Sequence, residues 1–121
     1  MHYAVLCYHD EAAVNAKTKE QDDALMADLA VVRQRLVAGG KMGPVARLMP
    51  TTAATTLRAG REPLIIDGPF AETKEQLLGF YIVDCASLDE AIGIARELGR
   101  EETGAFEIRP LRLLKERGEA P

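Results

Sequence analysis

The spacing of apolar residues divides this chain into strands and helices. Short runs rich in β-branched and aromatic residues predict strands, and apolar residues three or four positions apart predict helices. On this basis the sequence predicts strands over residues 2–9, 41–49, 78–85 and 105–111, helices that begin near residues 18 and 87, and a β-hairpin formed by residues 55–58 and 63–67.

The first predicted helix begins at a capping box and carries one apolar face. The Thr18 hydroxyl can accept the N–H of Gln21, while the Gln21 side chain reaches back to the Thr18 backbone. The apolar face recurs at helical spacing and consists of Leu25, Leu29, Val32 and Leu36. We expect Arg33 to point away from this face, and the helix to end at Gly39-Gly40, because glycine adopts the left-handed conformation readily.

The remaining segments contain recognisable local signals. Ser87 and Glu90 have the spacing of a second capping box, and Gly99 predicts the end of that helix. Pro44 cannot donate a ladder hydrogen bond, so the strand over residues 41–49 should be bulged or lie at a sheet edge. Residues 10–17 are expected to form a polar connection, and residues 72–76 a short helical turn.

The predicted order of elements is β-α-β, a hairpin, then β-α-β. This order is typical of an α+β fold with an antiparallel sheet, the ferredoxin-like split βαβ arrangement, here with an inserted hairpin. One domain should span residues 1–112, followed by a C-terminal tail over residues 113–121. Two helices cover only one face of such a sheet, so we expect a homodimer with the sheets packed face to face as a dimeric α+β barrel.

Composition and charge exclude several classes of partner. The chain has 121 residues and a net charge of −4, which disfavours nucleic acid and anionic membranes because both require a basic surface. The N-terminal sequence lacks the features of a signal peptide, and no apolar run is long enough to span a membrane, so we expect a cytoplasmic protein. Cys7 and Cys85 lack CxxC spacing and are expected to be buried free thiols.

The most informative stretch lies between two apolar strands. It runs over residues 67–81 as DGPFAETKEQLLGFY, and we call it the signature segment. An acid, a Gly-Pro turn, an aromatic ring and a run of charges are not needed for regular structure, so the composition indicates a shaped loop. Gly68 is expected to supply a positive or unusual φ angle, and Phe70 to pack in the core.

The signature segment resembles that of the DGPF-domain proteins in the YCII-related family of small bacterial proteins. The motif Asp67-Gly68-Pro69-Phe70 is similar to the one that names them, and the opening strand followed by His9-Asp10-Glu11 also resembles theirs. The resemblance covers residues 2 to about 110 and implies a dimeric α+β barrel. It further implies an acid–base site with a His–Asp pair in a cleft. Many such sequences carry a His or an aromatic residue midway along the first helix, where this chain has Leu29.

Three residues are candidates for catalysis: Asp67 as a base, His9 as a second proton carrier and Lys74 as an electrostatic stabiliser. Each also has a simpler interpretation, because turn aspartates accept backbone N–H groups and exposed charges often only contact water. The candidate ligand-binding residues are Tyr8, Pro44, Gly68, Pro69, Phe70 and Glu72.

No cofactor or metal is expected. Two His and two Cys residues without ligand spacing do not indicate a zinc site, and no Gly-rich phosphate loop is present. The leading interpretation is a small-molecule enzyme that uses acid–base groups in a cleft beside the Asp67–Phe70 loop. The alternatives are a non-catalytic ligand-binding or regulatory homodimer and, last, a purely structural homodimer, since a scaffold does not need so specific a loop.

Overall fold

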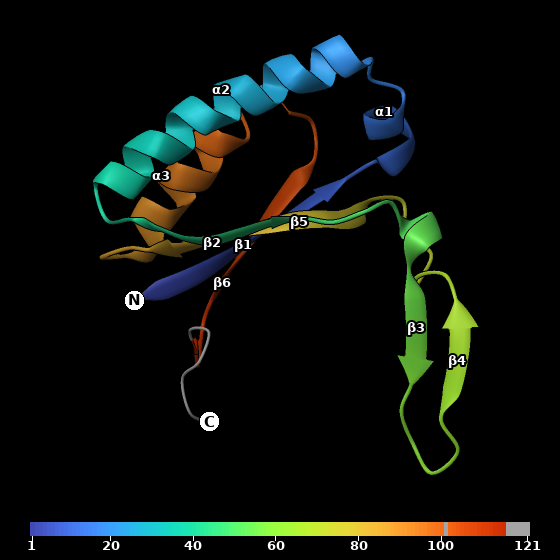
Figure 1. Cartoon of the computed structure of the whole chain (residues 1–121). Helices are drawn as coiled ribbons and strands as arrows, with labels where there is room; N and C mark the ends of the chain where they lie inside the picture. The colour runs from blue at the N-terminus through green and yellow to red at the C-terminus, as the bar shows by residue number, and fades with distance from the viewer. Residues whose placement is uncertain (101, 116–121) are drawn as a thin grey trace.

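Four antiparallel strands form one sheet in the computed structural model, which describes residues 1–100 and 102–115 (Figure 1). The sheet order is β2-β5-β1-β6, the order of a ferredoxin-like split βαβ fold. Its strands are β1 (His2–His9), β2 (Met42–Arg47), β5 (Gln76–Asp84) and β6 (Ala105–Pro110). The predicted α+β class is confirmed, and a single chain forms an open sheet rather than a closed barrel.

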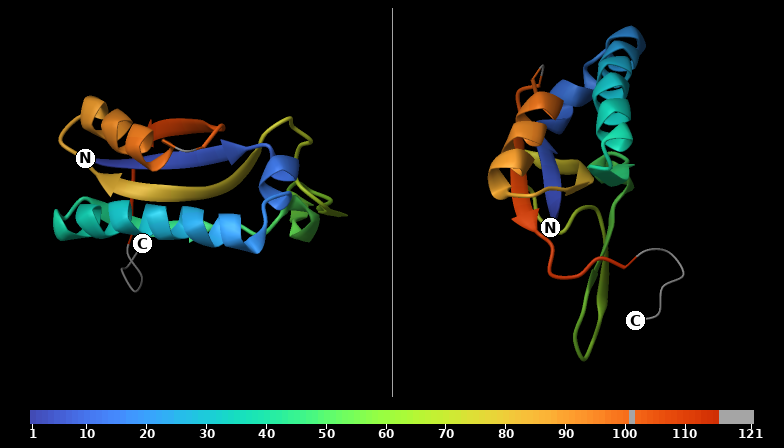
Figure 2. Two further views of the ribbon diagram at one scale, coloured as in Figure 1. Left: turned by 90° about the horizontal axis from the view of Figure 1, so that it is seen from above. Right: turned by 90° about the vertical axis from the view of Figure 1, so that its left-hand side faces the viewer.

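Two helices cover one face of this sheet. Helix α2 (Lys19–Ala38) lies over the β2 side and helix α3 (Leu88–Leu98) over the β1 and β6 side (Figure 2). The α2 capping box forms as predicted, with the Gln21 N–H donating to the Thr18 hydroxyl at 3.1 Å. The chain leaves α2 through Gly40, whose φ of +71° is the left-handed conformation that glycine favours.

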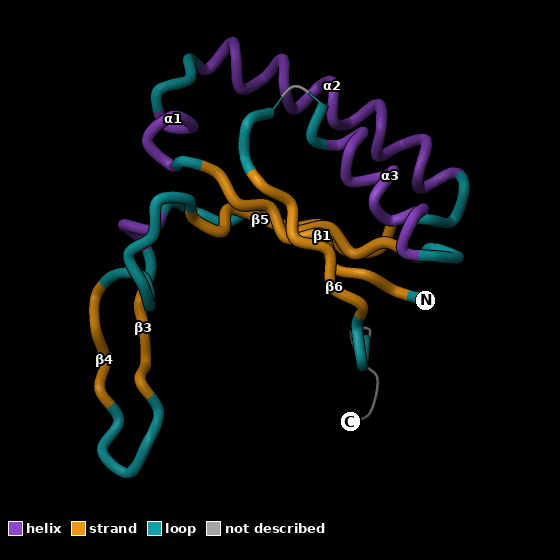
Figure 3. Tube along the Cα trace, turned by 180° about the vertical axis from the view of Figure 1, so that it is seen from behind, coloured by secondary structure: helices purple, strands orange, loops and turns teal. Residues whose placement is uncertain are grey.

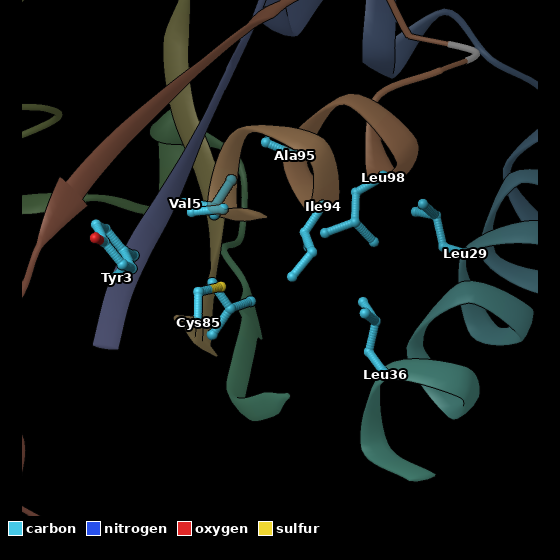
Figure 4. Close-up of a cluster of buried hydrophobic side chains, with 10 residues drawn as sticks. Tyr3, Val5, Leu29, Leu36, Cys85, Ile94, Ala95 and Leu98 are labelled. Atoms are coloured by element: carbon cyan, nitrogen blue, oxygen red, sulfur yellow. The ribbon is translucent and has the colours of Figure 1, made fainter. Parts of the chain in front are cut away.

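The core lies between the helices and the sheet. Val5 of β1, Val83 of β5 and Leu98 of α3 are its largest fully buried side chains. Leu29 and Leu36 on α2 point toward α3, where Ile94 and Leu98 lie, as Figure 4 shows. Both leucines are buried, which confirms the predicted apolar face of this helix at these two positions.

The inserted hairpin forms a separate two-stranded sheet. Strands β3 (Thr55–Arg58) and β4 (Leu64–Asp67) pair with each other and extend away from the main sheet on the side opposite the helices (Figures 1 and 3). All four residues of β4 are exposed. A two-stranded hairpin with apolar side chains in water is only marginally stable by itself.

Phe70 is exposed, and the prediction that it packs in the core is wrong. It follows strand β4 in the chain, 74% of its surface is accessible, and the Arg58 guanidinium lies 5.3 Å from the centre of its ring. This cation–π contact between Arg58 and Phe70 lies at the protein surface. Gly68 has a φ of +112°, as the sequence predicts for this position, and its N–H donates to the Ala54 carbonyl at 2.8 Å.

Two local segments differ from the sequence prediction. Residues expected to be a polar connection contain a short helix, α1 (Glu11–Asn15), because the Asp10 carboxylate accepts the N–H of Ala12 and caps it. The helical turn expected over residues 72–76 is absent from this described loop. Strand β5 already begins at Gln76, which pairs with His9 of β1. A 3₁₀ turn, η1 (Thr51–Ala53), joins β2 to the hairpin, and residues 116–121 of the predicted tail lie outside the described residues.

Candidate functional site

A cavity of about 390 Å³ lies between α2 and the sheet. Cys7 of β1 and Tyr81 of β5 form part of its floor, and Leu25, Leu29 and Arg33 of α2 form part of its roof. Helix α2 is longer than α3 and extends past it along the sheet (Figure 2). The volume falls within the range typical of small-molecule sites.

His9 and Glu102 form a partly enclosed pair at one end of this cavity. His9 is the last residue of β1, and Glu102 lies in the loop that connects α3 to β6. The Nε2 atom of His9 is 3.8 Å from a carboxylate oxygen of Glu102, and only 13% and 14% of the two side chains are accessible. The edge-on ring of Phe106, 5.6 Å away between centroids, further restricts the imidazole.

Arg33 contributes a guanidinium to the same cavity. It lies one helical turn after Leu29, so it continues the row of Leu25 and Leu29 that faces the sheet. The prediction that Arg33 points away from this face is therefore wrong. Its Nε atom is buried and has no hydrogen-bond partner among the described residues, which is uncommon because buried N–H groups are almost always paired.

Arg47 and Asp22 form a bidentate pair that links β2 to the first turn of α2. The two guanidinium nitrogens of Arg47 donate to the two carboxylate oxygens of Asp22 at 2.7 and 3.1 Å. This hydrogen bonding lowers the pKa of Asp22 below its usual value. Both residues line the cavity, so this ion pair connects α2 to the sheet beside it.

Tyr81 and Cys7 supply neutral polar groups to the floor. Burial raises the pKa of Tyr81 to about 12 and that of Cys7 to about 12, since desolvation disfavours the charged form. Both groups are therefore protonated near neutral pH. The Cys7 thiol donates weakly to the Val5 carbonyl at 3.7 Å, whereas the Tyr81 hydroxyl makes no hydrogen bond to any residue the structure describes.

Comparison with known proteins identifies the family of this fold and cavity. A family model of the YCII-related domain matches residues 1–115. The chain belongs to the YCII-related family. It is also similar to an uncharacterized protein of Rhizobium meliloti (strain 1021), with 58% identity over 124 aligned residues that cover 100% of this chain and 99% of that protein.

The signature segment of this YCII-related chain is tied to the rim of the cavity by hydrogen bonds. The Glu11 carboxylate accepts the N–H and the hydroxyl of Thr51. The Glu11 N–H donates to the Gln76 side chain at 2.9 Å, and the Gln76 amide in turn donates to the Thr73 carbonyl. Glu11 lines the cavity, so these contacts connect α1, η1 and the loop before β5 at one end of the site.

Of the candidate site residues, His9 lines the cavity of this YCII-related chain and the others do not. The remaining catalytic candidates, Asp67 and Lys74, are exposed on the hairpin arm and the loop that follows it. Among the described residues, the Asp67 carboxylate accepts no hydrogen bond, so the expected turn contact is not made. The same arm and loop also carry Gly68, Pro69, Phe70 and Glu72.

The two other candidates lie on the main sheet. The Tyr8 hydroxyl is 3.4 Å from a Glu107 carboxylate oxygen, outside the cavity lining. Pro44 occupies the irregular stretch of β2, exposed at the sheet edge, as expected for a proline in a strand.

Sequence reasoning missed Arg33 and Glu102. The position of Arg33 four residues after Leu29 was the available signal, whereas no local pattern marks Glu102.

Neither a metal-binding cluster nor a membrane-spanning helix is found in residues 1–100 and 102–115 of the YCII-related chain. Within these ranges no group of three or more His, Cys, Asp or Glu side chains is arranged to hold a metal ion. No described helix combines the length and apolar character that crossing a membrane requires. Both cysteines are free and buried, as the sequence predicts.

Proposed function

We propose that this YCII-related protein is a small-molecule enzyme that uses His9 as its acid–base group in the cavity beneath α2. The observation that carries the proposal is the His9–Glu102 pair, which lies 3.8 Å apart and largely shielded from water. Histidine is the side chain best suited to exchange protons near neutral pH. A carboxylate beside the imidazole can fix its orientation toward a substrate.

The surrounding groups support this role. Tyr81 and Cys7 keep their protons at neutral pH, so they can donate to a bound substrate without competing as bases. The apolar roof formed by Leu25 and Leu29 reduces the water content of the site, which strengthens electrostatic interactions within it. The chemistry supported best is therefore the removal or delivery of one proton on a small organic molecule.

We further propose that the protein acts as a homodimer in the cytoplasm. The free buried cysteines are typical of a reducing compartment. The hairpin arm carries exposed apolar side chains, Leu57, Leu64, Ile65 and Ile66, that a second copy would cover. Asp67 and Lys74 lie on or beside this arm, outside the cavity of their own chain, so catalytic roles for them would require the partner's cavity.

The acid–base role of His9 can be tested before the complete reaction is known. The test measures whether the protein catalyses replacement of hydrogen by deuterium at carbon atoms of a candidate substrate. The purified protein would be incubated in D₂O with a panel of small 2-oxo and 3-oxo carboxylic acids, and loss of their C–H signals followed by proton NMR. We expect exchange with at least one compound and at least a hundredfold slower exchange for His9→Gln, since positioned acid–base groups contribute about 10²–10⁴-fold.

The matched control is His2→Gln. His2 lies at the opposite end of β1, with 45% of its side chain accessible, and should leave the exchange rate unchanged. Equal rates for His9→Gln and the unmodified protein would contradict the proposal. Binding of the compounds without exchange above the buffer rate would instead favour the alternative, a non-catalytic ligand-binding or regulatory homodimer.

A further inference from the structure

Two positively charged side chains of the cavity lining have no carboxylate partner among the described residues. Three carboxylates that line it already have partners: Asp22 is held by Arg47, Glu102 lies beside His9, and Glu11 accepts two hydrogen bonds from Thr51. Arg33 and Lys17 also line it, and neither forms an ion pair with any residue the structure describes. Apart from His9, the lining carries three carboxylates and three Lys or Arg cations, so its formal charges balance; Arg33 and Lys17 are the two cations left without a carboxylate partner among the described residues.

Two donors that line the cavity remain without acceptors among the described residues. The Arg33 Nε–H is buried without a partner among the described residues, and the Tyr81 hydroxyl also makes no hydrogen bond within that set. Both side chains line the same cavity, Arg33 from α2 and Tyr81 from β5. A buried donor left without an acceptor is destabilising, so a site that retains one indicates an acceptor supplied by a ligand.

The rest of the lining is mainly apolar. Leu25, Met26 and Leu29 contribute from α2, with Val45 and Met49 from β2 and the segment after it. Such a surface binds the hydrocarbon part of a ligand, and its methionines adapt to ligand shape. A cavity of about 390 Å³ is large enough for a compact ring or a short branched chain.

We propose that the cavity binds a small organic acid, with the ligand carboxylate held by Arg33 and its apolar part between α2 and the sheet. A carboxylate matches the planar guanidinium and accepts from Tyr81 as well. The inference rests on the proposed function in that it uses the same cavity and names the substrate class that His9 would act on.

Paired probe molecules test the substrate class directly. Benzoate, benzamide and phenyl phosphate share one ring and differ in the group that Arg33 would bind, and their dissociation constants can be measured by calorimetry. We expect benzoate to bind at least tenfold more tightly than benzamide, because a hydrogen bond to a charged group contributes about 1.5–3 kcal/mol. Tenfold tighter binding of phenyl phosphate than of benzoate, or equal binding of benzoate and benzamide, would overturn the proposal.

The Arg33 Nε–H is itself observable by ¹⁵N NMR, which shows where the carboxylate sits. Saturating benzoate should shift this resonance and slow its exchange with water, while benzamide should not. An Arg33 signal that stays unchanged when benzoate is bound would exclude the assignment of Arg33 as the carboxylate ligand.

Arg33→Met retains the shape of the side chain and removes its donors. We expect at least a tenfold loss of benzoate affinity with no loss of thermal stability, since the variant also removes a buried unpaired group. Arg33→Lys should recover only part of the affinity, because it restores the charge without the planar fork. The matched control is Arg35→Met, which changes an arginine on the same helix that pairs with Glu97 instead. Unchanged benzoate binding in Arg33→Met would overturn the inference.

Failure of this inference is distinguishable from failure of the proposed function. Proton exchange that needs His9 but is indifferent to Arg33→Met would leave the acid–base function intact and remove the carboxylate assignment. Arg33-dependent binding of benzoate without any proton exchange would support the carboxylate assignment and contradict the acid–base function.

Discussion

Gly104 lies against His9 so closely that a methyl group added to it would fall 2.3 Å from the imidazole Nδ1 atom and 2.0 Å from the Tyr8 carbonyl oxygen. Real Cβ atoms essentially never approach other atoms closer than 3.0 Å. Glycine at this position therefore allows the loop after α3 to pack on the end of β1, and the same loop carries Glu102 to its place beside His9.

We predict that Gly104→Ala lowers the free energy of unfolding by about 1–3 kcal/mol, the usual cost of forcing extra atoms into a packed position. The rate of substrate proton exchange should also fall in this variant, because the loop that carries Glu102 must move away from His9. Gly93→Ala is the control, because nothing lies within 4 Å of the added methyl group and alanine favours a helix over glycine by roughly 0.5–1 kcal/mol. Urea unfolding of both variants measures the difference, and equal stabilities would show that the loop is not held tightly.

Leu36 tests the packing of α2 on the core. Its side chain is buried near α3, so Leu36→Ala should destabilise the protein by about 2–5 kcal/mol. Leu29→Ala should fall nearer the lower limit, because Leu29 already borders an open cavity. Val37→Ala, on the exposed side of the same helix, should change stability by less than about 0.5 kcal/mol. A loss for Leu36→Ala no larger than for Val37→Ala would contradict the core assignment.

The Cys7 thiol should resist alkylation in the folded protein. Burial raises its pKa from 9.0 to about 12, and only the thiolate reacts. Reaction with iodoacetamide at pH 8 should therefore be much slower in the native protein than in urea, and should accelerate as the pH rises toward 12. The raised pKa also stabilises the fold fully below pH 9.0, and this contribution is lost as the pH increases above that value. Rapid native labelling of Cys7 at pH 8, located by mass spectrometry, would contradict this prediction.

The proposed homodimer is testable through the hairpin arm. Ile65, with 70% of its surface accessible, lies among other exposed apolar residues of β3 and β4. We expect the unmodified protein to sediment as a dimer at micromolar concentration, with an interface on the order of 2,000 Å², and Ile65→Asp to shift it toward monomer. Val31→Asp, at an equally exposed site on α2, should leave the dimer intact. A stable monomer for the unmodified protein would contradict the proposal.

The sequence alone was enough to predict the fold class of this protein and most of its secondary structure, apart from residues 10–17 and 72–76. The signals involved act between neighbours in the chain, such as the Thr18–Gln21 capping box, the Gly40 helix end and the Pro44 irregularity in β2. The order of these elements then leaves few ways to build one sheet, and the ferredoxin-like order is the one found.

The tertiary structure alone decided which residues share a site. His9 and Glu102 are far apart in the chain and meet only because β6 pairs with β1 and Gly104 permits the close approach of their loops. Phe70 was expected to be buried and is exposed. The sequence shows that its side chain is hydrophobic, but it does not show whether another part of the chain packs over it. Local sequence determines backbone conformation through short-range contacts, but a cavity is formed by elements distant in sequence, so its lining is known only after they pack.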